Sequence, residues 1–228
     1  MAKNKNKKID NSFETIEETL SKTEQFLEKY QKQLTIVAAV LLIGVAIVFA
    51  YKKYVVIPQT AEAQEQVFVA QQYFERDSFN LALNGDGDFP GFLGIIDEYG
   101  STDVAGLSYY YAGISYYKLG EYEKAIDYLS DFSTSDKMLS AVTNGAIGDS
   151  YSELNKFDKA ANYYKKAADK SDNKLTTPIY LMKYGRVNEE LKNWKEALYA
   201  YTKIKKEYRD SQEGRSIEKF ITRVKINM

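Results

Sequence analysis

Three segments of this chain repeat one pattern, and this repeat constrains the fold more than any other feature. They run from 105 to 132, from 141 to 168 and from 178 to 204. Glycine recurs at 113, 148 and 185, leucine at 119, 154 and 191, an aromatic residue at 122, 157 and 194, and alanine at 125, 160 and 197. The spacing is therefore 35 and then 37 residues. A period of this length indicates stacked helical units, each burying its apolar face against its neighbours.

Each recurring position has a packing role. The glycine and the alanine are small because the two helices of one unit are expected to cross there at close range. The aromatic residue fills the wedge between successive helices. Gly120 and Asn155 occupy the position where a left-handed residue ends the first helix of a unit. Lys192 occupies the same position in the third unit and adopts that conformation less readily. Thr177 and Pro178 are predicted to be the N-cap and first residue of the third unit.

The repeat resembles the tetratricopeptide repeat family, whose units are helix–turn–helix pairs with small, aromatic and alanine residues at these positions. The expected fold class is all-α: a single transmembrane helix followed by an α-solenoid of tetratricopeptide repeats. We expect a linker helix and a degenerate repeat at 55–104, three repeats at 105–210 and a capping helix at 211–228. A capping pattern from Asp210 to Glu213 opens this last helix, whose apolar face covers the end of the stack.

A glycine-rich loop, residues 84–92, interrupts the degenerate repeat. Asp86 and Asp88 in this loop faintly resemble a calcium-binding loop. The glutamate that completes such a loop is missing, so a plain turn is favoured.

An uncharged apolar stretch occupies residues 34–51. Its 18 residues span roughly 27 Å as a helix, close to the hydrocarbon thickness of a bilayer. A transmembrane helix is predicted at 34–54, with a kink or a short break at Pro58. The alternatives are a buried soluble helix and a signal peptide cleaved near Ala50. The long segment before the stretch favours a retained signal anchor.

Lysines predict the orientation of this anchor. Seven precede it and only Lys52 and Lys53 follow it closely, so the N-terminus is expected in the cytoplasm. In a bacterial cell this topology predicts a single-pass inner-membrane protein with a periplasmic C-terminal domain.

The cytoplasmic tail, residues 1–33, contains a predicted amphipathic helix with a heptad-like apolar stripe. Its face comprises Phe13, Ile16, Leu20, Leu27 and Tyr30. The stripe is short for a stable coiled coil, so docking onto a partner and self-association both remain open.

Composition argues against catalysis and nucleic-acid binding. The chain has no histidine and no cysteine, and its formal net charge is −1. The usual general base and metal ligands are therefore missing, and no basic surface for phosphates is expected. No enzymatic activity, cofactor or metal is predicted. The acidic and lysine residues read as solvated charge on helix faces.

The whole layout, with the stretches at 61–100 and 107–129, resembles the YfgM-like family in its Bacteroidota-type versions. This resemblance implies an ancillary component of the Sec translocon. Its partners would be translocon subunits, periplasmic chaperones or secreted clients. A scaffold for assembling the outer membrane or cell wall is the alternative function.

In tetratricopeptide solenoids the first helix of each unit lines a groove that binds proteins. The corresponding positions here are Leu107, Tyr110, Ile114, Tyr117, Lys118, Asp149, Glu153, Met182, Arg186 and Glu189. Tyr110 and Tyr117 are the strongest candidates because exposed tyrosines suit binding hot spots. That both instead fill the core between helices is an equal alternative.

Overall fold

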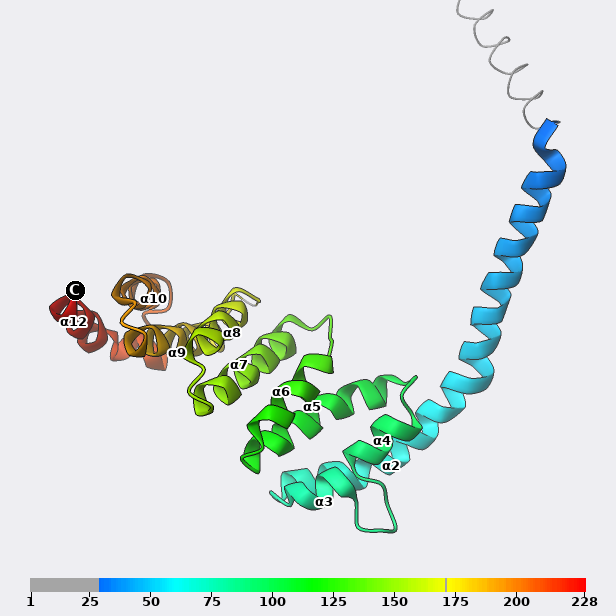
Figure 1. Ribbon diagram of the computed structural model, residues 1–228, viewed down its shortest axis with the longest axis horizontal. Helices are drawn as coiled ribbons and strands as arrows, with labels where there is room; N and C mark the ends of the chain where they lie inside the picture. The colour runs from blue at the N-terminus through cyan, green and yellow to red at the C-terminus, as the bar shows by residue number, and fades with distance from the viewer. Residues whose placement is uncertain (1–28, 171) are drawn as a thin grey trace, which may run out of the picture. The chain divides into compact units, whose positions relative to one another are not determined.

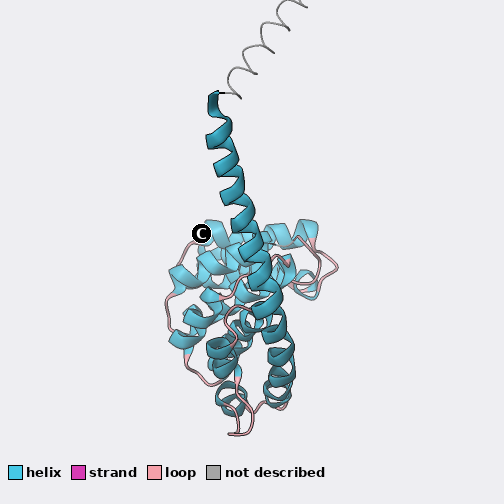
Figure 2. Cartoon of the chain, turned by 90° about the vertical axis from the view of Figure 1, so that its right-hand side faces the viewer, coloured by secondary structure: helices cyan, strands magenta, loops and turns pink. Residues whose placement is uncertain are grey.

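The structure is a computed structural model that describes residues 29–170 and 172–228. All regular elements in these ranges are helices, as Figures 1 and 2 show, which confirms the predicted all-α class. They are the π-helix η1 (Lys52–Val56) and the α-helices α2 (Ile57–Glu75), α3 (Phe79–Asn84), α4 (Phe92–Glu98), α5 (Asp103–Lys118), α6 (Tyr122–Asp131), α7 (Lys137–Glu153), α8 (Phe157–Lys170), α9 (Thr177–Glu190), α10 (Trp194–Glu207), α11 (Gln212–Arg215) and α12 (Ile217–Asn227). The chain divides between Ile57 and Pro58 into two compact units.

One helix in the described part of the chain, Lys29–Glu75, is long and apolar enough to cross a membrane. No residue of its most apolar window is buried. Leu42 and Phe49, for example, are each 70% exposed. The core helix of a soluble protein would hide such a surface within its own chain.

A π-helical turn stands where the sequence predicts a kink or break. The backbone N–H of Ile57 donates to the carbonyl of Lys52, one residue further back than in an α-helix. Pro58 has no backbone N–H, so it cannot donate a hydrogen bond to a carbonyl of the preceding turn. The wider π-helical turn accommodates this missing hydrogen bond. The helix runs on to Glu75, so the prediction of a break is wrong.

The repeat region consists of three helix pairs: α5 with α6, α7 with α8, and α9 with α10. The members of each pair contact one another, and α6 also contacts α7 while α8 contacts α9. The pairs therefore stack in chain order, as the ribbon in Figure 1 shows from green to orange.

The recurring glycines lie where the helices of a pair come closest. A Cβ at Gly148 would stand 2.7 Å from the ring of Tyr164, and one at Gly185 would stand 2.3 Å from the ring of Tyr201. At Gly113 the neighbour is Leu129, at 2.5 Å. The recurring alanines on the second helices, Ala125, Ala160 and Ala197, are fully buried. The predicted close crossing is confirmed.

The turns within the pairs share one left-handed residue. Gly120, Asn155 and Lys192 have φ of 80°, 56° and 58°. In each turn the N–H of the residue directly after the left-handed one donates to a carbonyl in the last turn of the first helix, as from Asn193 to the carbonyl of Asn188. Lys192 adopts this conformation although its side chain disfavours it.

Two predicted helix starts need correction. The N-cap of α9 is Thr176 rather than Thr177, and the side chain of Asn173 accepts hydrogen bonds from the N–H groups of Leu175 and Thr176. At the C-terminal end, Ser211 rather than Asp210 caps a short helix, α11. Gly214 in α11 packs so closely on the carbonyl of Tyr208 that a Cβ would lie 2.3 Å from it. The predicted single helix is therefore two helices.

The second of these, α12, packs on α10. Its predicted apolar face is buried and comprises Ile217, Phe220, Ile221 and Val224. It covers the end of the stack, as expected of a capping helix.

Helices α2, α3 and α4 form a separate core with α5. Ala70 on α2, Ala82 on α3 and Phe92 on α4 belong to one buried cluster. The loop between α3 and α4 is held by Asp86, which accepts hydrogen bonds from the Tyr73 hydroxyl and the backbone N–H groups of Asp88 and Phe89. These bonds lower the pKa of Asp86, led by that from Tyr73. The carboxylate thus stabilises a turn.

Candidate protein-binding site

The predicted binding positions of the first unit lie along α5. Leu107, Ile114 and Tyr117 are half-buried, and Lys118 is exposed at the end of the helix. Leu107, Ile114 and Lys118 follow one another at helical spacing, so they share one face of α5. This face offers a partner both apolar surface and a positive charge.

Tyr110 and Tyr117 are neither fully exposed nor fully buried. The Tyr110 ring packs on Phe132 with centroids 5.6 Å apart, beside the buried cluster that contains Ile147. The Tyr117 ring packs on Tyr122 at 5.7 Å. Burial raises the pKa of both hydroxyls, and the carboxylates of Asp149 and Glu153 add to the rise at Tyr117. Each tyrosine therefore fills the core with one side and leaves the other accessible.

Asp149 on α7 is the centre of an interaction between two units. It accepts a hydrogen bond of 2.7 Å from the Tyr164 hydroxyl of α8, and Lys183 of α9 donates to both its oxygens at 2.6 and 2.7 Å. The Tyr164 ring crosses Gly148 to reach it. Burial raises the pKa of Tyr164, and the charge of Asp149 raises it further. Asp149 thus links the second unit to the third.

Tyr180 packs the third unit on the second. Its ring lies so close to Gly145 of α7 that a Cβ there would stand 2.1 Å away. Burial raises the pKa of Tyr180 to about 12, with smaller contributions from Asp149 and Tyr110. Tyr180 therefore adds ring packing beside the link that Asp149 makes between the second and third units.

Glu189 on α9 is engaged in the same way at the end of the stack. It accepts hydrogen bonds from the Tyr201 hydroxyl at 2.5 Å and from two nitrogens of Arg223 at 2.7 Å. Burial alone would raise the pKa of Glu189, but the bonds from Arg223 and Tyr201 lower it overall. Arg186 lies over the Phe220 ring, 5.4 Å from its centroid. The capping helix therefore occupies these two predicted positions.

Met182 does not belong to an accessible surface. It is only 6% exposed and packs in the core of the second and third units. The expectation of an exposed methionine at this position is wrong, because its side chain turns inward where the third unit packs on the second. Glu153 and Lys118, by contrast, are exposed.

The structure therefore separates the predicted positions into two groups. The accessible ones are Leu107, Tyr110, Ile114, Tyr117, Lys118 and Glu153, in the first unit and at the end of α7, and Arg186 in the third unit. Asp149 and Glu189 are held by contacts between units, and Arg186, although exposed, packs on Phe220 of the capping helix.

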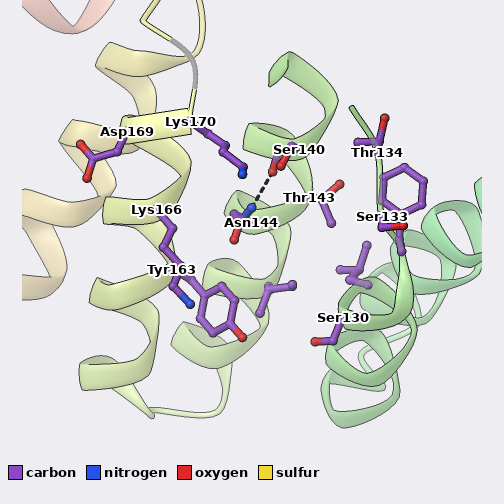
Figure 3. A pocket seen from close by; sticks show the side chains of 13 residues that line it. Ser130, Ser133, Thr134, Ser140, Thr143, Asn144, Tyr163, Lys166, Asp169 and Lys170 are labelled. Carbon is purple, nitrogen blue, oxygen red and sulfur yellow. Dashed lines mark hydrogen bonds between the residues drawn. The ribbon is translucent and has the colours of Figure 1, made fainter. Parts of the chain in front are cut away.

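A different hollow lies between α6, α7 and α8 (Figure 3). This pocket of about 610 Å³ borders the loop after α6. Helix α6 has ten residues, whereas α8, the second helix of the next unit, has fourteen. Leu129 and Ile147 are among the residues that line it, and Lys170 extends from α8 toward Asn144 in Figure 3. None of the predicted binding residues lines it.

Four residues of the predicted cytoplasmic face lie outside the described residues: Phe13, Ile16, Leu20 and Leu27. Tyr30 is described and half-buried, with the Lys29 ammonium 5.4 Å from its ring centroid. The face remains a prediction.

The prediction missed the tyrosines and cations that hold Asp149 and Glu189. A signal exists for the tyrosines: Tyr164 and Tyr201 each follow a recurring glycine by 16 residues, where the first unit has Leu129. For Lys183 and Arg223 there is no such signal, because their partners lie on another helix whose register only the packing sets.

Comparison with protein families found two matches, both described as tetratricopeptide repeat. One covers residues 107–135 and the other residues 146–211. Comparison with curated proteins found no match. Repeats of this family are protein-interaction modules. Together with the stacked helix pairs and their recurring glycines, the two matches identify the chain as a protein that contains tetratricopeptide repeats.

Proposed function

We propose that this protein is a membrane-anchored interaction module whose repeat domain binds other proteins. The accessible face of α5 carries the proposal. Leu107, Ile114 and Tyr117 offer half-buried apolar and aromatic surface beside the charge of Lys118. Preformed aromatic surface rimmed by charge is typical of binding hot spots.

We place the binding surface in the first two units. At the third unit Arg186 and Glu189 already contact the capping helix, so a ligand there would have to displace Arg223. Breaking a hydrogen-bonded charge pair costs more than contacting free side chains. A partner is therefore expected to contact α5 and the exposed Glu153 of α7.

We further propose that the long apolar helix is a retained anchor in a bacterial inner membrane. The uncovered apolar side chains between Leu34 and Tyr51 support a lipid environment. The excess of lysines before them supports a cytoplasmic N-terminus and a periplasmic repeat domain. The intact mass of the membrane-bound protein tests this. A retained anchor predicts the full 26.1 kDa, and a product that lacks about the first fifty residues contradicts it.

The partners we propose are subunits of the Sec translocon, periplasmic chaperones and secreted clients. This part rests on the resemblance of residues 61–100 and 107–129 to the YfgM-like family. Assembly of outer-membrane or cell-wall complexes is the alternative role of the same module.

Affinity purification of the full-length protein in mild detergent separates these roles. A photo-crosslinker at Leu41 in the anchor should capture translocon subunits. Capture of envelope-assembly factors instead would favour the scaffold. Recovery of no partner at either the anchor or α5 would contradict both roles.

A further inference from the structure

Charge is segregated along the repeat domain. Residues 58–136 contain fourteen acidic and three basic residues, whereas residues 137–228 contain twelve acidic and nineteen basic ones. The first part, here called the acidic half, has a formal charge of −11, and the second, the basic half, has +7. The net charge of −1 for the whole chain hides this asymmetry.

The fold places the two halves one after the other along the stack. The helices contact their neighbours in chain order, from α4 and α5 through α6, α7, α8 and α9 to α10 and α12. Segregation in sequence is therefore segregation in space, with α6 at the end of the acidic half and α7 at the start of the basic half. Fields of several kT are expected over such single-sign surfaces.

Ion pairing within the chain leaves this charge uncompensated. In the described ranges, 29–170 and 172–228, the pair Lys124–Glu121 lies inside the acidic half. The pairs Lys183–Asp149, Lys205–Glu218 and Arg223–Glu189 lie inside the basic half. No described ion pair joins the halves, so their mutual attraction is available to another molecule.

Both halves also expose large apolar side chains beside their charges. Phe68 on α2 is 59% exposed and follows the exposed Glu65 by three residues, on the same helix face. Tyr199 on α10 is 55% exposed and lines a shallow hollow with Lys195 and Lys206. Each half thus combines one sign of charge with apolar surface that can be buried on contact.

We infer that two copies of this chain pair with their repeat domains antiparallel, the acidic half of each against the basic half of the other. The second copy is the occupant because it alone is certain to offer both complementary surfaces. Like halves repel, which excludes the parallel arrangement. An antiparallel pair makes the same contact twice and closes, as isologous dimers do. Where the proposed membrane anchor holds, confinement to one bilayer raises the effective concentration for pairing.

Sedimentation velocity of the full-length protein in mild detergent tests this inference. We expect the mass of two copies at about 50 mM salt and an association constant at least about tenfold lower at about 500 mM, because screening weakens attraction between exposed charges. The measurement does not depend on the anchor's topology, so its failure would leave the proposed function standing.

Charge-reversed variants identify the surfaces. E65K/E75K/D131K in the acidic half and K165E/K195E/K206E in the basic half change residues that are exposed. The three changes bring the formal charge of the acidic half from −11 to −5, or that of the basic half from +7 to +1. Each variant alone should therefore associate at least about tenfold more weakly than the wild type, and a mixture of the two should regain affinity through the unaltered half of each. The control K165R/K195R/K206R keeps the charge and should pair like the wild type.

Three results would overturn the inference. They are a monomer at low salt, assemblies larger than two copies, and pairing that neither set of reversals weakens. The last result would instead place self-association in the anchor or the cytoplasmic tail.

Discussion

Gly148 and Gly185 illustrate how one residue determines the packing of a unit. Each lies under a tyrosine ring that passes over it to a carboxylate on the same helix, Asp149 or Glu189. A side chain at either glycine would push the ring away and also break the hydrogen bond of its hydroxyl. The glycine therefore serves both apolar packing and the polar link to the next unit.

Gly148→Ala should lower the free energy of unfolding by about 1–3 kcal/mol, since the methyl group overpacks a site where Tyr164 lies 2.7 Å away. Gly106→Ala is the matched control. Gly106 is also inside a helix, but no atom lies within 4 Å of its Cβ position, so this change should stabilise by about 0.4–1 kcal/mol. Urea unfolding of both variants measures the difference, and equal effects would refute the packing role.

Lys192 carries backbone strain that glycine would relieve. At φ of 58°, Lys192→Gly should stabilise the protein by roughly 1 kcal/mol. Lys195→Gly, inside α10, should destabilise by about as much. A shift of the thermal midpoint in the same direction for both would contradict the assigned turn.

At the level of elements, the capping helix is joined to the last unit by Arg223 and Glu189 as well as by apolar burial. The Glu189 side chain is only 11% exposed, whereas both partners of the pair Lys205–Glu218 are largely exposed. Geometry and partial burial make the first pair the stronger link between elements.

A double-mutant cycle of Glu189→Gln and Arg223→Met should give a coupling free energy of about 1 kcal/mol or more. A cycle of Lys205→Met and Glu218→Gln should give a coupling free energy of about 0.5 kcal/mol or less. Denaturant unfolding supplies all the values. If the coupling free energy at Glu189 were no larger than that at Glu218, the pair Arg223–Glu189 would not help to hold the capping helix.

The lowered pKa of Glu189 makes this contribution depend on pH. Its folded pKa lies below the ordinary 4.5, so the stabilisation is fully present above 4.5 and is lost as pH falls through the folded pKa. The stability difference between wild type and Glu189→Gln should therefore shrink on acidification below 4.5. A difference that grows there would contradict the assignment.

The sequence predicts the paired helices and their turns well because these depend on local signals: the spacing of glycine, alanine and aromatic residues. The first predicted segment ends at 132, and α6 ends at Asp131, where Phe132 is extended and Asp136 then caps α7. The sequence misses the links through Lys183 and Arg223, since these join residues 34 positions apart whose approach depends on how units stack.

At the scale of the whole molecule, the chain joins an uncovered apolar helix to a stack of tetratricopeptide repeats with an open face at its first unit. The last unit packs on α12 and the first packs on α3 and α4, so both ends of the stack are covered. Partners are therefore expected on the accessible face of α5 and not at either end.

Photo-crosslinking in intact membranes tests whether this face binds proteins. A crosslinkable residue at Tyr117 should yield adducts with another protein, and one at the exposed Asn162 on α8 should not. Tyr117→Ala should weaken the binding free energy for that partner by about 1 kcal/mol or more, which is a loss of affinity of at least about fivefold. The recovery of the partner with protein purified from the same membranes measures this loss. Adducts at Asn162 but none at Tyr117 would contradict binding through the first unit.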